Sequence, residues 1–169
     1  MAVLGLAGLG HMAVKLATSM GAEVTVLSTS PAKEADARRL GAHEFALTSD
    51  RAIFDRFSRR FDLILDTASA PHDLNGHLGM LRVDGTLVLL GVPAKPMLLN
   101  ASPLIGGRRT LAGSLIGGIA ETQEMLDYCA AREIRADVEV VPIQKINEIY
   151  ERMVSGDVRY RFVIDLSTL

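Results

Sequence analysis

The sequence predicts an α/β protein built on a doubly wound parallel β-sheet. The chain begins with an apolar stretch, a glycine-rich turn and an apolar helical pattern, in that order. Stretches of apolar and β-branched residues then alternate with helical patterns along the chain, which is typical of parallel strands joined by crossover helices. Small and hydroxyl-bearing residues follow several of these strands, and open α/β sheets bind ligands at that edge.

The glycine-rich turn lies within the first eleven residues, Met-Ala-Val-Leu-Gly-Leu-Ala-Gly-Leu-Gly-His. A G-x-G-x-x-G turn lets a strand reverse into a helix so tightly that the free N–H groups of the helix face a pyrophosphate. In that register the chain has Gly5, Ala7 and Gly10, with Gly8 as a further small residue. The methyl group of Ala7 should push a dinucleotide slightly outward or demand an adjusted turn. The same glycines could mark only a flexible turn, so the flanking strand and helix are what favour dinucleotide binding.

The remaining elements follow the same alternation. Gly21 and Gly41 have the position of helix C-caps, and Pro31 suits a first helical turn with Ser30 as its cap. Residues 83–85 are expected to form a turn and residues 92–109 an irregular segment, because the latter contains three prolines and a Gly-Gly pair. The predicted strands are 2–4, 23–27, 44–47, 61–65, 86–90, 110–115, 138–141 and 161–166, and the predicted later helices are 32–40, 50–60, 73–81, 121–133 and 144–154.

The composition argues against several classes of protein. With 169 residues, 49% of them hydrophobic, the chain is long enough for the core of one domain. A net charge of −2 and the lack of a Lys/Arg-rich run argue against nucleic acid or a membrane surface as partner. No apolar run is long enough to span a bilayer, so a cytoplasmic location is the default expectation. The single cysteine, Cys129, excludes a disulfide framework within the chain, and its helical spacing from Met125 and Leu126 predicts a buried side chain.

The end of the second strand decides which nicotinamide dinucleotide fits. A carboxylate there accepts hydrogen bonds from the ribose hydroxyls of NAD(H) and repels a 2′-phosphate. The expected position falls at Thr29, and no Asp or Glu occurs between Thr25 and Lys33. Ser28, Thr29 and Ser30 offer hydroxyls and Lys33 a cation, so NADP(H) is favoured. Alternatively, Ser30 only caps a helix and Lys33 lies on a solvated face. The missing carboxylate also argues against an S-adenosylmethionine methyltransferase.

Four separated segments carry a family resemblance: residues 5–15, 24–31, 112–126 and 157–165. They are similar to the cofactor-binding half of zinc-dependent medium-chain alcohol dehydrogenases, specifically the cinnamyl-alcohol-dehydrogenase-like aldehyde reductases that use NADP(H). The resemblance covers essentially the whole chain and implies a three-layer Rossmann fold. It also implies reversible hydride transfer between the nicotinamide and a primary alcohol or aldehyde, with a zinc ion polarising the substrate oxygen. The family has glycine where this chain has Ala7.

The resemblance also implies where the cofactor lies. Leu9 and Gly10 would face the pyrophosphate beside the turn residues Gly5, Ala7 and Gly8. The 2′-phosphate would lie against Ser28, Thr29, Ser30 and Lys33, and the trough from adenosine to nicotinamide would be lined by Thr67, Gly91, Val92, Ser114 and Ile116.

The zinc ligands of the family lie in its other half, which this chain lacks. With one cysteine and four histidines, His11, His43, His72 and His77, neither a metal site nor a catalytic residue is expected. His72 and His77 are expected on the surface of a helix. Whether the chain is an enzyme on its own is therefore left open.

The resemblance divides the chain into a cofactor-binding domain, residues 1–136, and a C-terminal segment, residues 137–169, that packs on the zinc-bearing half in the family. Without that partner, the apolar side chains of the segment, among them Ile146, Ile149 and Met153, should pack on the rim of the sheet or on another chain. The strand from Thr110 to Leu115 resembles the edge strand through which family members pair, so a homodimer is expected.

Three functional hypotheses remain. The first is a truncated or separately encoded NADP(H)-binding domain of an alcohol dehydrogenase-type oxidoreductase. The second is a stand-alone NADP(H)-binding or regulatory module that acts with a separately encoded partner. The third is a zinc-independent reductase that uses a serine or a tyrosine. Tyr128, Tyr150 and Tyr160, however, lie far along the chain from the nucleotide edge, and none precedes a lysine in a Tyr-x-x-x-Lys pattern.

Overall fold

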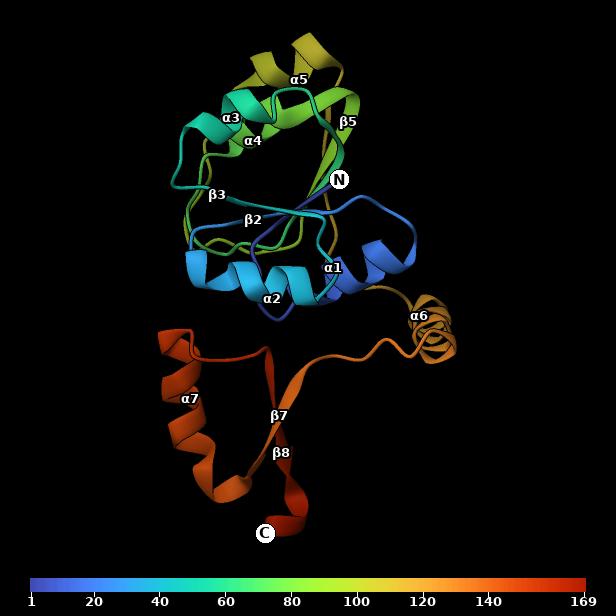
Figure 1. The fold of residues 1–169 in the computed structure, drawn as a ribbon, viewed down its shortest axis with the longest axis vertical. Helices are drawn as coiled ribbons and strands as arrows, with labels where there is room; N and C mark the ends of the chain where they lie inside the picture. The colour runs from blue at the N-terminus through green and yellow to red at the C-terminus, as the bar shows by residue number, and fades with distance from the viewer.

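A six-stranded, all-parallel sheet forms the centre of the protein, in a computed structural model that describes all 169 residues (Figure 1). The strand order is β3-β2-β1-β4-β5-β6, so the chain runs outward from β1 in one direction and then in the other. This confirms the predicted doubly wound sheet. The strands are β1 (Ala2–Leu4), β2 (Thr25–Ser28), β3 (Glu44–Leu47), β4 (Phe61–Asp66), β5 (Leu81–Leu89) and β6 (Thr110–Gly113).

Helices cover both faces of the sheet, giving three layers (Figure 1). One face carries α1 (Gly10–Ser19) and α2 (Glu34–Arg39), which follows a 3-10 turn at Pro31–Lys33. The other carries α3 (Ala52–Arg56), α4 (Leu74–Met80) and α5 (Ala101–Gly107). Successive residues of β1 point to opposite faces, because Ala2 and Leu4 belong to the core under α3 and α4 whereas Val3 belongs to the core under α1 and α2. The central strand is therefore buried on both sides although it has only three residues.

Two segments differ from the sequence predictions. Residues 83–85 are not a turn between elements: β5 continues through them, with Asp84 in a left-handed conformation at φ 62°. The segment 92–109 is not wholly irregular, because it contains α5. Pro103 is tolerated there since it stands in the first helical turn, where its missing N–H has no partner in any case. The Asn100 side chain caps α5 by accepting a hydrogen bond from the Ser102 N–H.

The last third of the chain leaves the sheet. Helix α6 (Ile119–Ala131) is followed by a βαβ unit of β7 (Val138–Pro142), α7 (Ile146–Ser155) and β8 (Arg161–Asp165), with 3-10 turns at Ile143–Lys145 and Leu166–Thr168. Strands β7 and β8 pair in parallel as a separate two-stranded sheet, and Figure 1 shows this C-terminal unit beyond α1 and α2. Cys129 of α6 is buried, as predicted. None of the helices combines the length and the hydrophobicity that a bilayer crossing demands.

The apolar face of α7 is only partly covered. Ile149 is buried, but Met153 remains 52% exposed and Ile146 is also exposed. Met153 and Ile146 therefore do not take the first of the two predicted positions, on the rim of the six-stranded sheet. Coverage by another chain stays a prediction.

We expect Leu78→Ala to destabilise the fold, because the Leu78 side chain is fully buried in the core under α3 and α4. A buried leucine truncated to alanine costs about 2–5 kcal/mol of unfolding free energy, through lost burial and the cavity left behind. Urea unfolding followed by circular dichroism measures this loss. Val154→Ala is the matched control, since Val154 is 90% exposed and should change the unfolding free energy little; equal effects of the two substitutions would contradict this assignment of the core.

Candidate functional site

The turn between β1 and α1 is a close contact of backbone with backbone. Gly5 has a φ of +90°, and its N–H donates to the Leu27 carbonyl at 2.9 Å. A Cβ atom on Gly10 would overlap the carbonyl of Gly5, so only glycine fits there. No side chain caps the first turn of α1, and no acidic residue lies in it. The N-terminus of a ten-residue helix is thus left open to an anion, as the sequence pattern predicts.

Ala7, which replaces the middle glycine of the pattern, lies on the outside of this turn. Its side chain is exposed, and its carbonyl accepts hydrogen bonds from the His11 backbone N–H at 3.0 Å and from His11 Nδ1 at 3.1 Å. The turn closes without strain at Ala7, which is absent from the residues with positive φ. Whether its methyl group displaces a dinucleotide stays a prediction.

The hydroxyl-rich segment after β2 borders a cavity of about 240 Å³ beside this turn. Ser28, Thr29, Ser30 and Lys33 all line it together with Gly5. Ser28 Oγ accepts a hydrogen bond from the Ser30 N–H at 3.2 Å, which shapes the loop. Ser30 stands at the N-cap position of the 3-10 turn, but its side chain makes no capping hydrogen bond. The alternative interpretation of Ser30 as a side-chain cap is therefore wrong.

Two histidines, His72 and His77, line another part of this cavity, and the buried Asp66 carboxylate holds His72 without lining the cavity itself. Asp66 Oδ2 pairs with His72 Nε2 at 2.7 Å, and this hydrogen bond raises the pKa of His72 above its ordinary value. His77 is only 2% exposed, and burial lowers its pKa. The prediction of surface helix residues is wrong for both: His72 precedes α4 and is held by Asp66, while His77 lies on the buried side of α4.

The remaining predicted residues spread along the same edge of the sheet. Thr67 follows β4, and its hydroxyl donates to the Leu4 carbonyl at 2.9 Å, directly beside Gly5. Gly91 follows β5 and packs so closely against Ala68 that a Cβ atom on Gly91 would overlap the Ala68 carbonyl. Val92 is exposed, and Ser114 and Ile116 line a separate opening in front of α6. The structure thus brings Gly5 of the turn and the segment after β2 together at one cavity. The other predicted residues do not line it: Ala7, Gly8, Leu9, Gly10, Thr67, Gly91, Val92, Ser114 and Ile116.

Two residues at this edge escaped the sequence analysis. Arg161, at the start of β8, donates a hydrogen bond to the Gly8 carbonyl at 3.1 Å from 153 positions away. Tyr160 stacks on His11, directly after the turn, with ring centroids 4.7 Å apart. Tyr160 is distant from the nucleotide edge in sequence but not in space, which corrects that expectation. The only local signal was the cationic and aromatic run from Arg159 to Arg161.

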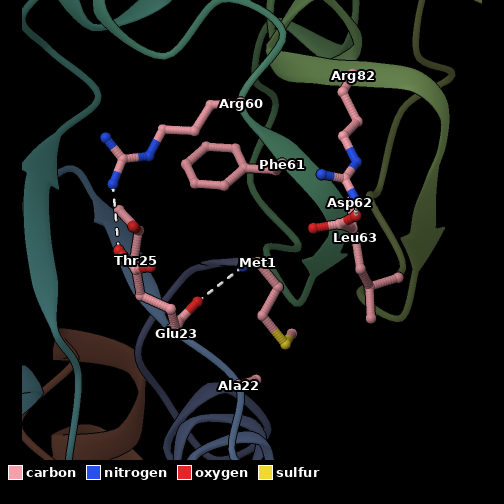
Figure 2. Close-up of a pocket in the computed structure, with 9 residues that line it drawn as sticks. All are labelled: Met1, Ala22, Glu23, Thr25, Arg60, Phe61, Asp62, Leu63 and Arg82. Atoms are coloured by element: carbon pink, nitrogen blue, oxygen red, sulfur yellow. Dashed lines mark hydrogen bonds and ion pairs between the residues drawn. The ribbon is translucent and has the colours of Figure 1, made fainter.

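Another cavity, of about 490 Å³, lies at the opposite edge, where the strands begin (Figure 2). Figure 2 shows its charged side chains coming from neighbouring strands and turns. They are paired with one another, Arg60 with Glu23 at 3.3 Å and Arg82 with Asp62. The N-terminal amine of Met1 donates to the Glu23 carbonyl at 2.7 Å. Because its charges are already satisfied and no glycine turn borders it, this cavity lacks the features of a nucleotide site.

A model of the zinc-binding dehydrogenase family matches residues 8–131, most of the chain. The chain belongs to this family. It is 56% identical to NADP-dependent alcohol dehydrogenase C 1 of Mycolicibacterium smegmatis, over 99% of the chain and 48% of that protein. It is 51% identical to mannitol dehydrogenase of Petroselinum crispum, over 98% of the chain and 49% of that protein. The chain therefore spans about half the length of the curated relatives it matches.

Solved structures agree with this membership. A cinnamyl alcohol dehydrogenase from Sorghum bicolor superposes with a TM-score of 0.95 at 42% identity, over 98% of this chain and 47% of that one. The CAD of Helicobacter pylori, solved in complex with NADP(H), gives a TM-score of 0.88 at 34% identity, again over 98% and 47%. The resemblance seen in the four sequence segments is thus confirmed.

The zinc ion of the family name does not fit the residues of this zinc-binding dehydrogenase chain. No three His, Cys, Asp or Glu side chains come together as a metal site requires. A dinucleotide does fit, because the glycine contact at Gly5 and Gly10 leaves backbone open where any Cβ would block it.

We expect the Asp66–His72 pair to make stability depend on pH. Because the folded state raises the pKa of His72 above 6.5, the pair stabilises the fold fully below that pH and loses its effect as pH rises through the raised value. Asp66→Asn should lower the pKa of His72 and flatten this dependence. Proton NMR titration of the histidine ring, assigned by its absence in His72→Asn, together with thermal unfolding between pH 5 and 9, measures both effects. An unchanged pKa of His72 in Asp66→Asn would refute the pairing.

Proposed function

We propose that this chain is the NADP(H)-binding domain of an alcohol dehydrogenase or aldehyde reductase-type oxidoreductase. The observation that carries the proposal is the make-up of the cavity beside the glycine turn. It joins three consecutive hydroxyl residues, Ser28 to Ser30, to the cation of Lys33, and no Asp or Glu lines it. A 2′-phosphate needs such a site, whereas the ribose of NAD(H) is usually held by a carboxylate. The relatives named NADP-dependent alcohol dehydrogenases support the same cofactor.

The residues of this chain bind and orient the cofactor. The open N-terminus of α1 and the backbone at Leu9 and Gly10 receive the pyrophosphate, and Arg161 adds a cation beside Gly8. The Thr67 side chain is bound to the Leu4 carbonyl, and Gly91 has no side chain. Neither residue therefore obstructs a nucleotide that lies across this edge of the sheet. When bound, the nicotinamide supplies or accepts a hydride, which the oxidoreductase exchanges with a primary alcohol or aldehyde. No residue of this chain is assigned a catalytic role.

A second candidate function is a stand-alone NADP(H)-binding or regulatory module that acts with a separately encoded partner. One surface feature favours a protein partner: a groove of about 390 Å³ between α1, β4 and Leu90, which follows β5, is lined only by hydrophobic residues. Leu9 and Met20 at its border are 50% and 66% exposed. Apolar patches of this kind mark contacts with other polypeptides.

The proposal extends to the division of the chain into two parts and to its pairing with a second copy. Residues 1–136 form the cofactor-binding domain and residues 137–169 a C-terminal segment, a division supported by the separate β7–β8 sheet. Strand β6 lies at the edge of the main sheet, and Leu115, Ile116 and Ile119 beyond it are almost fully exposed. An unpaired edge with apolar neighbours suits pairing with a second copy, so the chain forms a homodimer through the stretch from Thr110 to Leu115.

Lys33→Met should weaken NADPH binding about tenfold and leave NADH binding nearly unchanged, because one charge-assisted contact to the 2′-phosphate is lost. Titration of nucleotide fluorescence at fixed salt measures both dissociation constants. Lys145→Met, which removes an exposed lysine of the C-terminal unit, is the control and should change neither. Equal weakening of both nucleotides by Lys33→Met would place Lys33 away from the phosphate, and no binding of either by the unaltered chain would end the proposal.

Leu115→Glu should shift the chain from dimer to monomer, because it places a charge in the proposed edge contact beside β6. Sedimentation velocity across a range of protein concentrations measures the association. Val154→Glu is the control: this side chain is equally exposed but lies on α7, so it should leave the dimer intact. A monomer before any substitution would overturn the assignment of the edge strand.

A further inference from the structure

Tyr160 of the C-terminal segment is buried next to Lys33, which lines the cavity beside the glycine turn. Its side chain is only 3% exposed and belongs to the core formed with α1 and α2. Its ring stacks on His11 at an interplanar angle of 14°, and the Nζ atom of Lys33 lies 5.2 Å from the ring centroid. A tyrosine of the C-terminal unit thus touches both the helix after the glycine turn and the one lysine that lines the cavity.

The position of Tyr160 is fixed by backbone contacts. Its N–H donates to the Asp137 carbonyl at 3.1 Å, and the N–H of Asp137 donates to His11 Nε2 at 3.3 Å. The Asp137 carboxylate pairs with Lys15 of α1 and with Arg39 of α2, the latter at 2.8 Å. Tyr160 is therefore anchored to both helices rather than resting loosely on them.

Lys33 differs from the other cations near it. Arg38 pairs with Glu34, Arg39 with Asp36 and Asp137, and Arg159 with Asp36. Lys33 forms no ion pair, and the face of Tyr160 is the partner of its ammonium group. Burial raises the pKa of Tyr160 to about 12, so the ring stays neutral and keeps its electron-rich face throughout the physiological range.

We propose that Tyr160 is a positioning residue that holds the Lys33 ammonium group at the cavity and so strengthens the preference for NADP(H) over NAD(H). A lysine side chain is otherwise flexible, and ordering it on binding would reduce affinity for the phosphate. The Tyr160 ring holds the Lys33 side chain in place before the nucleotide binds. NAD(H) has no 2′-phosphate to contact the ordered ammonium group, so Tyr160 should raise the affinity for NADP(H) only. This inference rests on the proposed function.

The test compares NADPH and NADH titrations for Tyr160→Leu and Tyr160→Phe in the full chain. Tyr160→Leu should raise the dissociation constant for NADPH about fivefold, as loss of a partly exposed cation–π contact predicts. NADH binding should change less than about twofold. Tyr160→Phe keeps the ring and should match the unaltered chain. In a Lys33→Met background, Tyr160→Leu should have no further effect on the ratio of the two constants, because the group it positions is gone.

Each failure has its own signature. If the unaltered chain binds neither nucleotide, the proposed function falls and this inference with it. If NADPH is preferred and Tyr160→Leu weakens both cofactors equally, or the effect persists without Lys33, Tyr160 is structural only and the inference alone is overturned. Thermal unfolding shows whether each variant is folded.

NMR of the unaltered chain decides the matter if Tyr160→Leu does not fold. The chain has four lysines, and reductive methylation with ¹³C gives each a resolvable signal while keeping its charge. The Lys33 signal, assigned by its loss in Lys33→Met, should be displaced by the ring current and should move with adenosine 2′,5′-bisphosphate but not with ADP. A Lys33 signal at the position of a free lysine would overturn the inference.

Discussion

The contact of Gly10 with the carbonyl of Gly5 is the constraint on which the rest of this structure depends. It brings the first turn of α1 directly against the end of β1, and any side chain at Gly10 would separate them. The Thr67 hydroxyl fills the remaining space and ties β4 to the same turn, while Gly91 lets the chain after β5 approach Ala68. Main-chain groups of three strands therefore meet at one edge, and a ligand there faces backbone dipoles rather than side chains.

The C-terminal unit is part of this site although it lies outside the main sheet. Its contacts converge on α1 and α2, which Asp137 joins, and Arg161 reaches the carbonyl of Gly8 in the glycine turn. These contacts are polar and partly exposed, so individually they stabilise little. They act by position: they hold the Tyr160 ring and the Arg161 guanidinium group beside a turn in which the main sheet supplies only small residues.

The features predicted correctly from the sequence are those that depend on residues close together in the chain. The strand–glycine–helix order, the missing carboxylate at Thr29 and the buried position of Cys129 all depend on local pattern, and each was found in the structure. The features that were missed depend on distant partners. Nothing beside Tyr160 in the sequence shows that it meets His11, and nothing beside His72 shows that Asp66 draws it inward. Helix α5 was hidden by a proline that is harmless only in a first turn.

The pairing of Asp66 with His72 clarifies how a cavity that borders a buried carboxylate can still suit a phosphate. Asp66 ends β4 at the cavity side, and alone its charge would repel an anion at short range because the surroundings are poorly screened. The hydrogen bond to that carboxylate raises the pKa of His72, and whenever His72 is protonated the two groups form a pair with no net charge. The pair thus removes a repulsion without adding an attraction. Among the residues that line the cavity, the remaining unpaired charge is the ammonium group of Lys33, so the preference for NADP(H) that we propose would depend on where that single group is held.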